Sequence, residues 1–241
     1  MSTPAHIGVD GCKAGWFYVR IVGAHYTFGV VPTVESLLRP SLNAERVFID
    51  IPIGLRDRDG IARQCDTAAR KLLGPSRRSS VFPAPIRAIL QANSFDDARA
   101  QSRALTGKSP SKQTFFIMPK IHEVDSLMRT NSRARLVMRE AHPELCFCGL
   151  AGGQAMTHKK STLAGFQERL DVLRRFFPAA DSLVESALSS YLRKEVAKDD
   201  ILDALVCAVV ATMSQQWVTV PATPELDSHG IPMEMVYAEV N

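Results

Sequence analysis

The longest apolar pattern lies near the end of the chain, between residues 198 and 213. It is rich in Ala, Leu and Val and free of Gly and Pro, which predicts a helix that is apolar nearly all round and therefore buried. Asp203 interrupts this pattern, and Asp200 lies one turn earlier on the same helix face. Two carboxylates on a buried face cost free energy unless a positive charge offsets them. A bound cation is therefore our first expectation.

Helix capping is the alternative for the acidic residues at the start of this helix. Acidic side chains suit the first helical turn, where Asp199 or Asp200 would cap it. Asp199 is the better candidate for the cap, and Asp200 is shared between cap and ligand. Asp203 lies about a turn too deep for a capping role.

Apolar runs earlier in the chain predict strands that end in aspartates. The first three predicted strands, joined by short turns into a β-meander, are residues 6–11, 16–22 and 26–31. A fourth run, residues 46–50, reads as a central strand buried on both faces, and Pro52 ends it. Asp10 and Asp50 fall at the carboxyl ends of two strands, where open sheets usually build their sites. Plain turn aspartates are the alternative for both.

Residues 135–147 predict a return to strand. A period of two would place Glu140, His142 and Glu144 on one face, so Glu140 and Glu144 are further candidates for the acidic site. Cys146 and Cys148 alternate as strand residues would, and we interpret them as packing. Later amphipathic helices are expected at residues 161–177 and 183–194, the segment with Pro221 and Pro224 is expected to be loop, and a last strand is expected at residues 233–240.

The charges are unevenly distributed along the chain. Residues 56–135 carry 16 Lys and Arg against 7 Asp and Glu, whereas the remainder carries 13 against 18. This segment lacks predicted strands, which indicates a mainly helical insertion that covers the site of a single domain, 1–241. Its basic charge predicts an anionic partner, with nucleic acid the first candidate. A solvated basic helical face is the alternative. The residues expected to hold phosphates are Arg77, Arg78, Arg87 and Lys120. The pair Lys159 and Lys160 is expected to be solvated.

Length and composition are those of an ordinary globular protein. The chain has 241 residues, 46% hydrophobic and 22% charged, enough to bury a core in one large domain. Five cysteines without a CxxC pair suit a reducing compartment. The first residues have no basic start and no apolar run of signal-peptide length, so we expect no signal peptide. No apolar run reaches the length of a membrane span. We expect a cytoplasmic location and no membrane partner.

Several short motifs resemble known families in combination. The strands Ile7-Gly-Val-Asp10-Gly and Phe48-Ile-Asp50-Ile-Pro, with the helix Asp200-Ile-Leu-Asp203-Ala-Leu, resemble the ribonuclease H-like superfamily, and the helix is similar to that of RuvC-type Holliday-junction resolvases. A second set of motifs resembles a widespread family of uncharacterised proteins regarded as predicted nucleases with this fold. That set is Arg78-Ser-Ser-Val-Phe-Pro-Ala-Pro85, Pro119-Lys-Ile-His-Glu-Val-Asp125 and Glu140-Ala-His-Pro-Glu144. The resemblance spans nearly the whole chain. It implies an α/β fold with a mixed five-stranded sheet, order 3-2-1-4-5, flanked by helices, and metal at the ends of strands 1 and 4.

The resulting expectation is a metal-dependent nuclease that uses Mg²⁺ or Mn²⁺, since these hard cations prefer carboxylate oxygens. In a two-metal mechanism Asp10 would bridge both ions, and Asp50, Asp200 and Asp203 would complete the ligands. One alternative is a catalytically inactive nucleic-acid-binding or regulatory protein. A less favoured one is an actin-like phosphotransferase or ATPase, because that fold needs a second Asp-Gly phosphate loop in a duplicated half, and the sequence contains no internal repeat. The sequence leaves open DNA or RNA, cleavage polarity, and the oligomeric state, including a homodimer.

Overall fold

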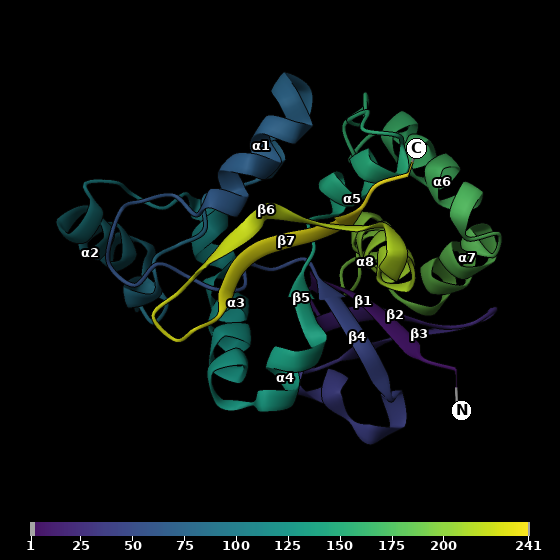
Figure 1. Cartoon of the computed structure of the whole chain (residues 1–241), viewed down its shortest axis with the longest axis horizontal. Coiled ribbons are helices and arrows are strands. Elements are labelled where there is room, and N and C mark those ends of the chain that lie inside the picture. Colours follow the sequence, from purple (N-terminus) through teal and green to yellow (C-terminus); the bar gives the residue numbers. More distant parts are fainter. Residues whose placement is uncertain (1–2, 241) are drawn as a thin grey trace.

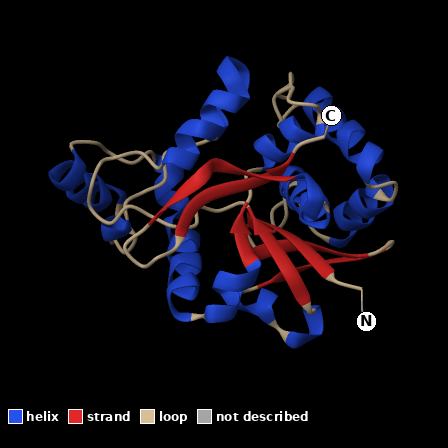
Figure 2. Ribbon diagram, in the orientation of Figure 1, coloured by secondary structure: helices blue, strands red, loops and turns tan. Residues whose placement is uncertain are grey.

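Five strands form the larger sheet of the computed structural model, which describes residues 3–240 (Figures 1 and 2). They are β1 (Ala5–Cys12), β2 (Gly15–Val22), β3 (His25–Val31), β4 (Ala44–Ile49) and β5 (Met138–Glu140). Their order in space is β3-β2-β1-β4-β5. Neighbours among the first three strands are antiparallel, while β4 and β5 continue the sheet parallel to β1. The predicted mixed α/β architecture and its strand order are confirmed.

Helices and a second, two-stranded sheet complete the described chain. The α-helices are α1 (Gln64–Arg77), α2 (Phe95–Thr106), α3 (Lys112–Thr130), α4 (Ser132–Val137), α5 (Pro143–Leu150), α6 (Leu163–Phe176), α7 (Ala180–Ser190) and α8 (Lys198–Thr212). Short 3-10 turns are η1 (Val34–Leu38), η2 (Pro40–Leu42), η3 (Arg78–Ser80), η4 (Arg87–Ile89) and η5 (Ser214–Gln216). The small antiparallel sheet pairs β6 (Trp217–Leu226) with β7 (Pro232–Ala238). Within residues 3–240, no helix has the length and apolar character that crossing a membrane requires.

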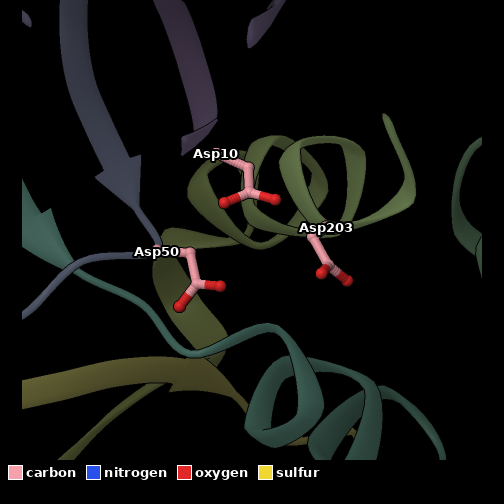
Figure 3. A group of neighbouring side chains, drawn as sticks. All are labelled: Asp10, Asp50 and Asp203. Atoms are coloured by element: carbon pink, nitrogen blue, oxygen red, sulfur yellow. The ribbon is translucent and has the colours of Figure 1, made fainter. Parts of the chain in front are cut away.

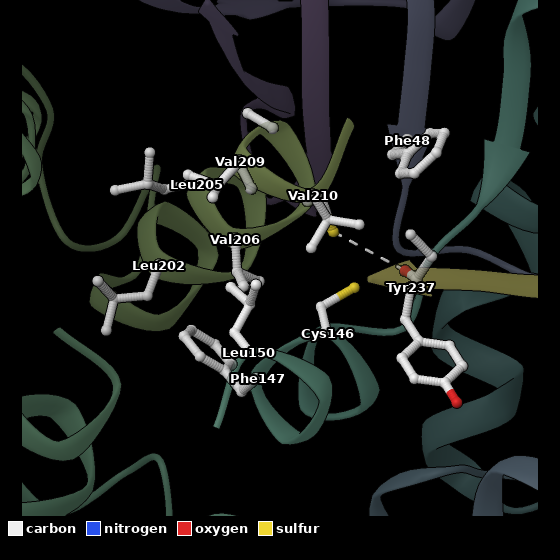
Figure 4. Packing of buried hydrophobic residues seen from close by; sticks show 14 of the residues in the cluster. Phe48, Cys146, Phe147, Leu150, Leu202, Leu205, Val206, Val209, Val210 and Tyr237 are labelled. Carbon is white, nitrogen blue, oxygen red and sulfur yellow. Dashed lines mark hydrogen bonds between the residues drawn. The ribbon is translucent and has the colours of Figure 1, made fainter. Parts of the chain in front are cut away.

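Helices cover both faces of the larger sheet, because successive strand residues point to opposite sides. Phe17, Val19 and Phe48 pack into one hydrophobic cluster with α5, α7 and α8. Ile7 and Val9 point the other way, into a cluster with α3 and α4. Figure 4 shows the first cluster, in which side chains of α5 and α8 meet Phe48 of the sheet and Tyr237 of β7.

The helix α8 is buried as predicted. Every residue from Ile201 to Ala211 is buried, and the helix lies directly on β1. A Cβ atom at Gly8 would lie under 3.0 Å from backbone atoms of Ala204 and Ala208. The three small residues therefore let the helix backbone approach the strand closely, which carries Asp203 toward the end of β1.

Between β4 and β5 the chain contains α1 to α4 and no strand. This agrees with the helical character expected for residues 56–135. Figure 1 shows α1 and α2 extending away from the larger sheet, while α3 runs back toward it and α4 lies beside β4 and β5. Whether this segment is an insertion into an older domain stays a prediction.

Two element predictions were wrong. Only Met138–Glu140 of the predicted strand 135–147 is extended, and α5 begins at Pro143. Proline suits the first turn of a helix, where its missing N–H would have no partner. Glu140, His142 and Glu144 therefore do not share a strand face, and Cys146 and Cys148 pack from a helix. The predicted C-terminal loop is β6, whose pairing shifts register between Val220 and Glu225, where its prolines lie.

Candidate metal centre

Three aspartates from distant parts of the chain converge at one edge of the larger sheet. Asp10 lies near the end of β1, Asp50 directly follows β4, and Asp203 lies in the second turn of α8. One carboxylate oxygen from each of them lies within 4.8 Å of the other two. Figure 3 shows the three side chains gathered between the ends of β1 and β4 and the helix α8. We call these residues the aspartate triad.

The register of the parallel strands explains why Asp10 and Asp50 meet. Val9 of β1 pairs with Ile49 of β4, and the Asp50 backbone N–H donates to the Val9 carbonyl oxygen at 3.0 Å. Gly8 and Phe48, which precede the two aspartates by two residues, are also opposite each other. Because strand residues two apart share a face, both carboxylates project toward the face that α8 covers.

Burial and mutual repulsion raise the pKa of all three carboxyl groups. Burial is the largest cause in each case, and it raises the pKa of Asp50 to about 7, with Asp203 adding to the shift. For Asp10 the pKa lies well above its usual range, because Asp50 and Asp203 add to the effect of burial. The pKa of Asp203 is also raised by burial, although Lys160 opposes the shift. The protein alone therefore compensates these charges incompletely.

The triad fits a divalent metal ion. Asp203 is only 2% exposed, and its Oδ1 has no hydrogen-bond partner in the described chain. An unpaired buried carboxylate oxygen is costly, and a cation would satisfy it. The donors are all carboxylate oxygens, which suits Mg²⁺ or Mn²⁺ rather than a softer ion.

Asp200, the fourth predicted ligand, lies outside the triad. Its Oδ2 accepts a hydrogen bond of 2.7 Å from the Ala197 backbone N–H, so it caps the N-terminus of α8. Burial raises its pKa to about 6. Asp199, which we expected to be the cap, instead lies 3.3 Å from the Lys160 ammonium. Asp200 therefore takes the capping role that we gave first to Asp199, while Asp199 forms an ion pair with Lys160.

The two glutamates are each held by a buried arginine. Arg63 donates to both oxygens of Glu140, at 2.8 and 2.9 Å, and also pairs with Asp66. Burial raises the pKa of Glu140 to about 7, even though Arg63 acts in the opposite direction. Glu144 pairs with Arg169, while its Oε2 has no hydrogen bond. Glu140 is therefore a structural ion-pair partner, and Glu144 borders the site.

A cleft of about 370 Å³ opens beside the triad. Asp50 and Asp203 form part of its wall, and the other lining residues are Arg77, Ser79, Ser80, Phe82, Gln113, His142, Pro143, Glu144, Lys159, Lys160, Ser161 and Arg169. Basic side chains thus line the same cleft as the carboxylates of Asp50 and Asp203. This arrangement suits a ligand that carries both a negative charge and a group to be presented to the triad.

The structure separates the four predicted phosphate-binding residues. Arg77 lines the cleft and donates to the Met156 carbonyl oxygen at 2.7 Å, while its buried Nη2 has no partner in the described chain. Arg78 is exposed. Lys120 lies close to Gly11 with its ammonium 4.3 Å from the ring centre of Trp16, donates to the Gly15 carbonyl oxygen, and has a pKa lowered by burial.

Arg87, which we predicted to hold phosphates, is occupied by ion pairs instead. Its guanidinium contacts the carboxylates of three residues, Asp57, Asp125 and Asp227. These carboxylates compensate its charge and occupy its donors, so Arg87 ties η4 to α3 and to the β6–β7 turn rather than facing the cleft. A buried or half-buried Arg is often held in this way, because its planar donors match carboxylates.

Sequence reasoning missed Lys160. We expected it to be solvated with Lys159, yet its ammonium donates to Asp203 Oδ2 at 2.7 Å. Burial by itself would lower the pKa of Lys160, but contact with Asp203 outweighs burial and raises it. Arg169 was not predicted either. No local signal in the sequence distinguishes Lys160 from Lys159, because the difference arises from the path of the loop before α6.

A family comparison covers most of the chain and all of the triad. The family described as Protein of unknown function (DUF429) matches residues 8–226. The chain belongs to this family. The DUF429 match begins within β1 just before Asp10 and extends past α8, so the elements that carry the triad all lie inside it. No curated protein and no solved structure matches the chain.

Proposed function

We propose that this DUF429 protein is a metal-dependent nuclease that hydrolyses phosphodiester bonds of nucleic acid. The observation that carries the proposal is the aspartate triad, which gathers three carboxylates, one of them with a buried unpaired oxygen, beside a cleft that basic side chains also line. We further propose that the fold is ribonuclease H-like. The sheet order and the placement of aspartates after two parallel central strands and on the helix that covers them support this assignment.

The roles of the residues follow from their positions. Asp10, Asp50 and Asp203 would hold Mg²⁺ or Mn²⁺. The bound ion supplies Lewis acidity that stabilises the charge developing on the phosphate. Hydrolysis forms a P–O bond to water and breaks the opposite P–O bond; the water loses a proton, and the leaving oxygen gains one. Arg77 offers an unpaired buried donor on the cleft wall, and the exposed Arg78 follows it, so both are placed to attract the phosphate backbone.

The test is a cleavage assay with Mg²⁺ or Mn²⁺ on single-stranded, duplex, hybrid and branched substrates. We expect cleavage that a chelator abolishes and that Asp10→Asn and Asp203→Asn each remove. Asp96→Asn is the matched control, because it removes the same charge from a side chain that is 88% exposed. Metal-dependent cleavage that survives both triad substitutions would contradict the proposed site. Binding of nucleic acid without cleavage would indicate a catalytically inactive binding protein, and nucleotide hydrolysis without strand cleavage would indicate a phosphotransferase-type enzyme.

A further inference from the structure

Lys160 places a fixed positive charge inside the candidate metal centre. Its ammonium lies 2.7 Å from Asp203 Oδ2 and 3.3 Å from an oxygen of Asp199. The two oxygens of Asp203 therefore differ: Oδ2 accepts a hydrogen bond from the lysine, while the buried Oδ1 has no hydrogen-bond partner in the described chain. Only the second oxygen is available to a metal ion without breaking an existing ion pair.

The surrounding carboxylates supply few additional ligands. Asp200 accepts a hydrogen bond from the backbone at the start of α8, and Glu140 is held by Arg63. Glu144 pairs with Arg169 through Oε1, and its Oε2 lies 3.7 Å from Arg77 Nε. The aspartate triad is the only group of three or more potential metal-binding side chains found among the described residues. Lys160 already supplies one positive charge to this group. A second divalent cation would lie close to that ammonium, and the repulsion between like charges is unfavourable.

We propose that Lys160 takes the place of a second divalent ion, so that the triad binds one metal ion instead of two. This inference rests on the proposed function only for the presence of a metal. A second ion could use Asp203 Oδ2 only by displacing the lysine that already bonds to it. Mg²⁺ keeps several waters and is commonly held by only one or two protein carboxylates, so the available triad oxygens are sufficient for one ion.

Lys160 would also act as a positioning residue. Its hydrogen bond to Oδ2 restrains the Asp203 carboxylate and leaves Oδ1 without a hydrogen-bond partner in the described chain. The ammonium lines the cleft beside Asp50 and Asp203, and it supplies a preorganised charge where a substrate phosphate would approach the carboxylates. The Lys160 side chain remains 44% exposed, so its charge is also accessible from the cleft.

The test counts Mn²⁺ ions bound to the full-length chain, by electron paramagnetic resonance of free Mn²⁺ and by calorimetry, without substrate. We expect one ion per chain in the unsubstituted protein and two in Lys160→Met, because the substitution frees Asp203 Oδ2 and removes the opposing charge. Lys160→Arg should keep the count at one. Lys159→Met is the matched control; it removes the same charge from the neighbouring exposed residue and should also bind one ion. Lys160→Gln repeats the measurement should the methionine variant fold poorly.

Two ions bound to the unsubstituted protein would overturn the inference, as would a count of one in both Lys160→Met and Lys160→Gln. The proposed function fails separately: one ion bound without cleavage of any nucleic acid would refute the nuclease and leave the assignment of Lys160 standing. Two bound ions together with triad-dependent cleavage would refute the assignment of Lys160 and leave the nuclease standing. Absence of Mn²⁺ binding would overturn both.

Discussion

Gly8 lies against the backbone of Ala204, so closely that a Cβ atom at position 8 would be under 3.0 Å from the Ala204 carbonyl oxygen. Gly8 precedes Asp10 by two residues on the same strand face, and Ala204 directly follows Asp203. The contact between the two small residues thus sets the separation of two of the triad carboxylates. It links the packing of α8 on β1 to the geometry of the candidate metal centre.

Gly8→Ala should therefore impair both folding and metal binding. Overpacking of this kind costs about 1–3 kcal/mol or more, and any shift of α8 away from β1 would separate Asp203 from Asp10. Urea denaturation and Mn²⁺ titration would measure the two effects. Gly29→Ala is a suitable control, because its Cβ would meet only the side chain of Tyr18, and it should change stability by less than about 1 kcal/mol. A Gly8→Ala protein with ordinary stability and Mn²⁺ affinity would contradict the role given to this contact.

The triad and Asp200 should respond differently to substitution. We expect Asp10→Asn, Asp50→Asn and Asp203→Asn each to weaken Mn²⁺ binding by more than about 100-fold, since even partners outside the ligand shell can cost 10–100-fold. Asp200→Ala should cost about 1 kcal/mol of stability through loss of the cap, with Mn²⁺ affinity reduced less than about tenfold. Calorimetry and thermal unfolding distinguish the two classes. A loss of Mn²⁺ affinity in Asp200→Ala as large as in Asp50→Asn would show that Asp200 is a metal ligand.

Metal affinity should rise with pH through neutrality. Protons compete with the ion for the carboxylates, and the pKa of Asp50 is raised to about 7 by burial and by Asp203. Below this pH the affinity for Mn²⁺ should fall about tenfold for each pH unit per competing proton. Titrations at several pH values would show this slope. An affinity that is constant from about pH 5 to about pH 8 would indicate that the triad is already ionised.

Without metal, Asp50 should destabilise the fold at high pH. The pKa of its carboxyl group is about 7 in the folded protein against an ordinary value of 3.8, so the folded chain binds more protons between these values, and stability falls as pH rises. Asp50→Asn removes this penalty. In chelator, it should stabilise the protein by about 1–2 kcal/mol at about pH 8 and by little at about pH 4. Equal effects at both pH values would show that the charge is compensated by other groups.

Glu140 should prove structural. Glu140→Ala would leave the buried Arg63 with Asp66 as its remaining carboxylate partner and would remove the hydrogen bond to the Ile53 backbone N–H. Breaking a buried pair costs about 3–5 kcal/mol. The loss should appear in chemical denaturation with or without Mn²⁺, while the number of bound ions stays unchanged. A variant of ordinary stability that binds fewer ions would assign Glu140 to the metal centre after all.

The first strands, the buried helix and the aspartates at strand ends could be predicted from the sequence, because each depends on a local pattern, whereas the strand order came from the family resemblance. A period of two defines β1 to β3, a long apolar run defines α8, and Asp10, Asp50 and Asp203 stand where those patterns end or are interrupted. The mistaken strand 135–147 shows the limit of such patterns. Its short apolar run is consistent with either period, and Pro143 marked a helix start that tertiary packing completes.

The sequence by itself thus determined which residues carry acidic chemistry, and the resemblance implied by its motifs indicated the kind of fold that would gather them. Only the tertiary structure decided which of them remain free for a cation. Ion pairs with residues distant in the sequence hold Glu140, Glu144 and Arg87. The path of the loop before α6 brings Lys160 to Asp203. Such pairings depend on distances between side chains in the folded protein, which local patterns do not encode. The physical reason is electrostatic: in a poorly solvated interior, each charge takes the nearest opposite charge that the fold presents.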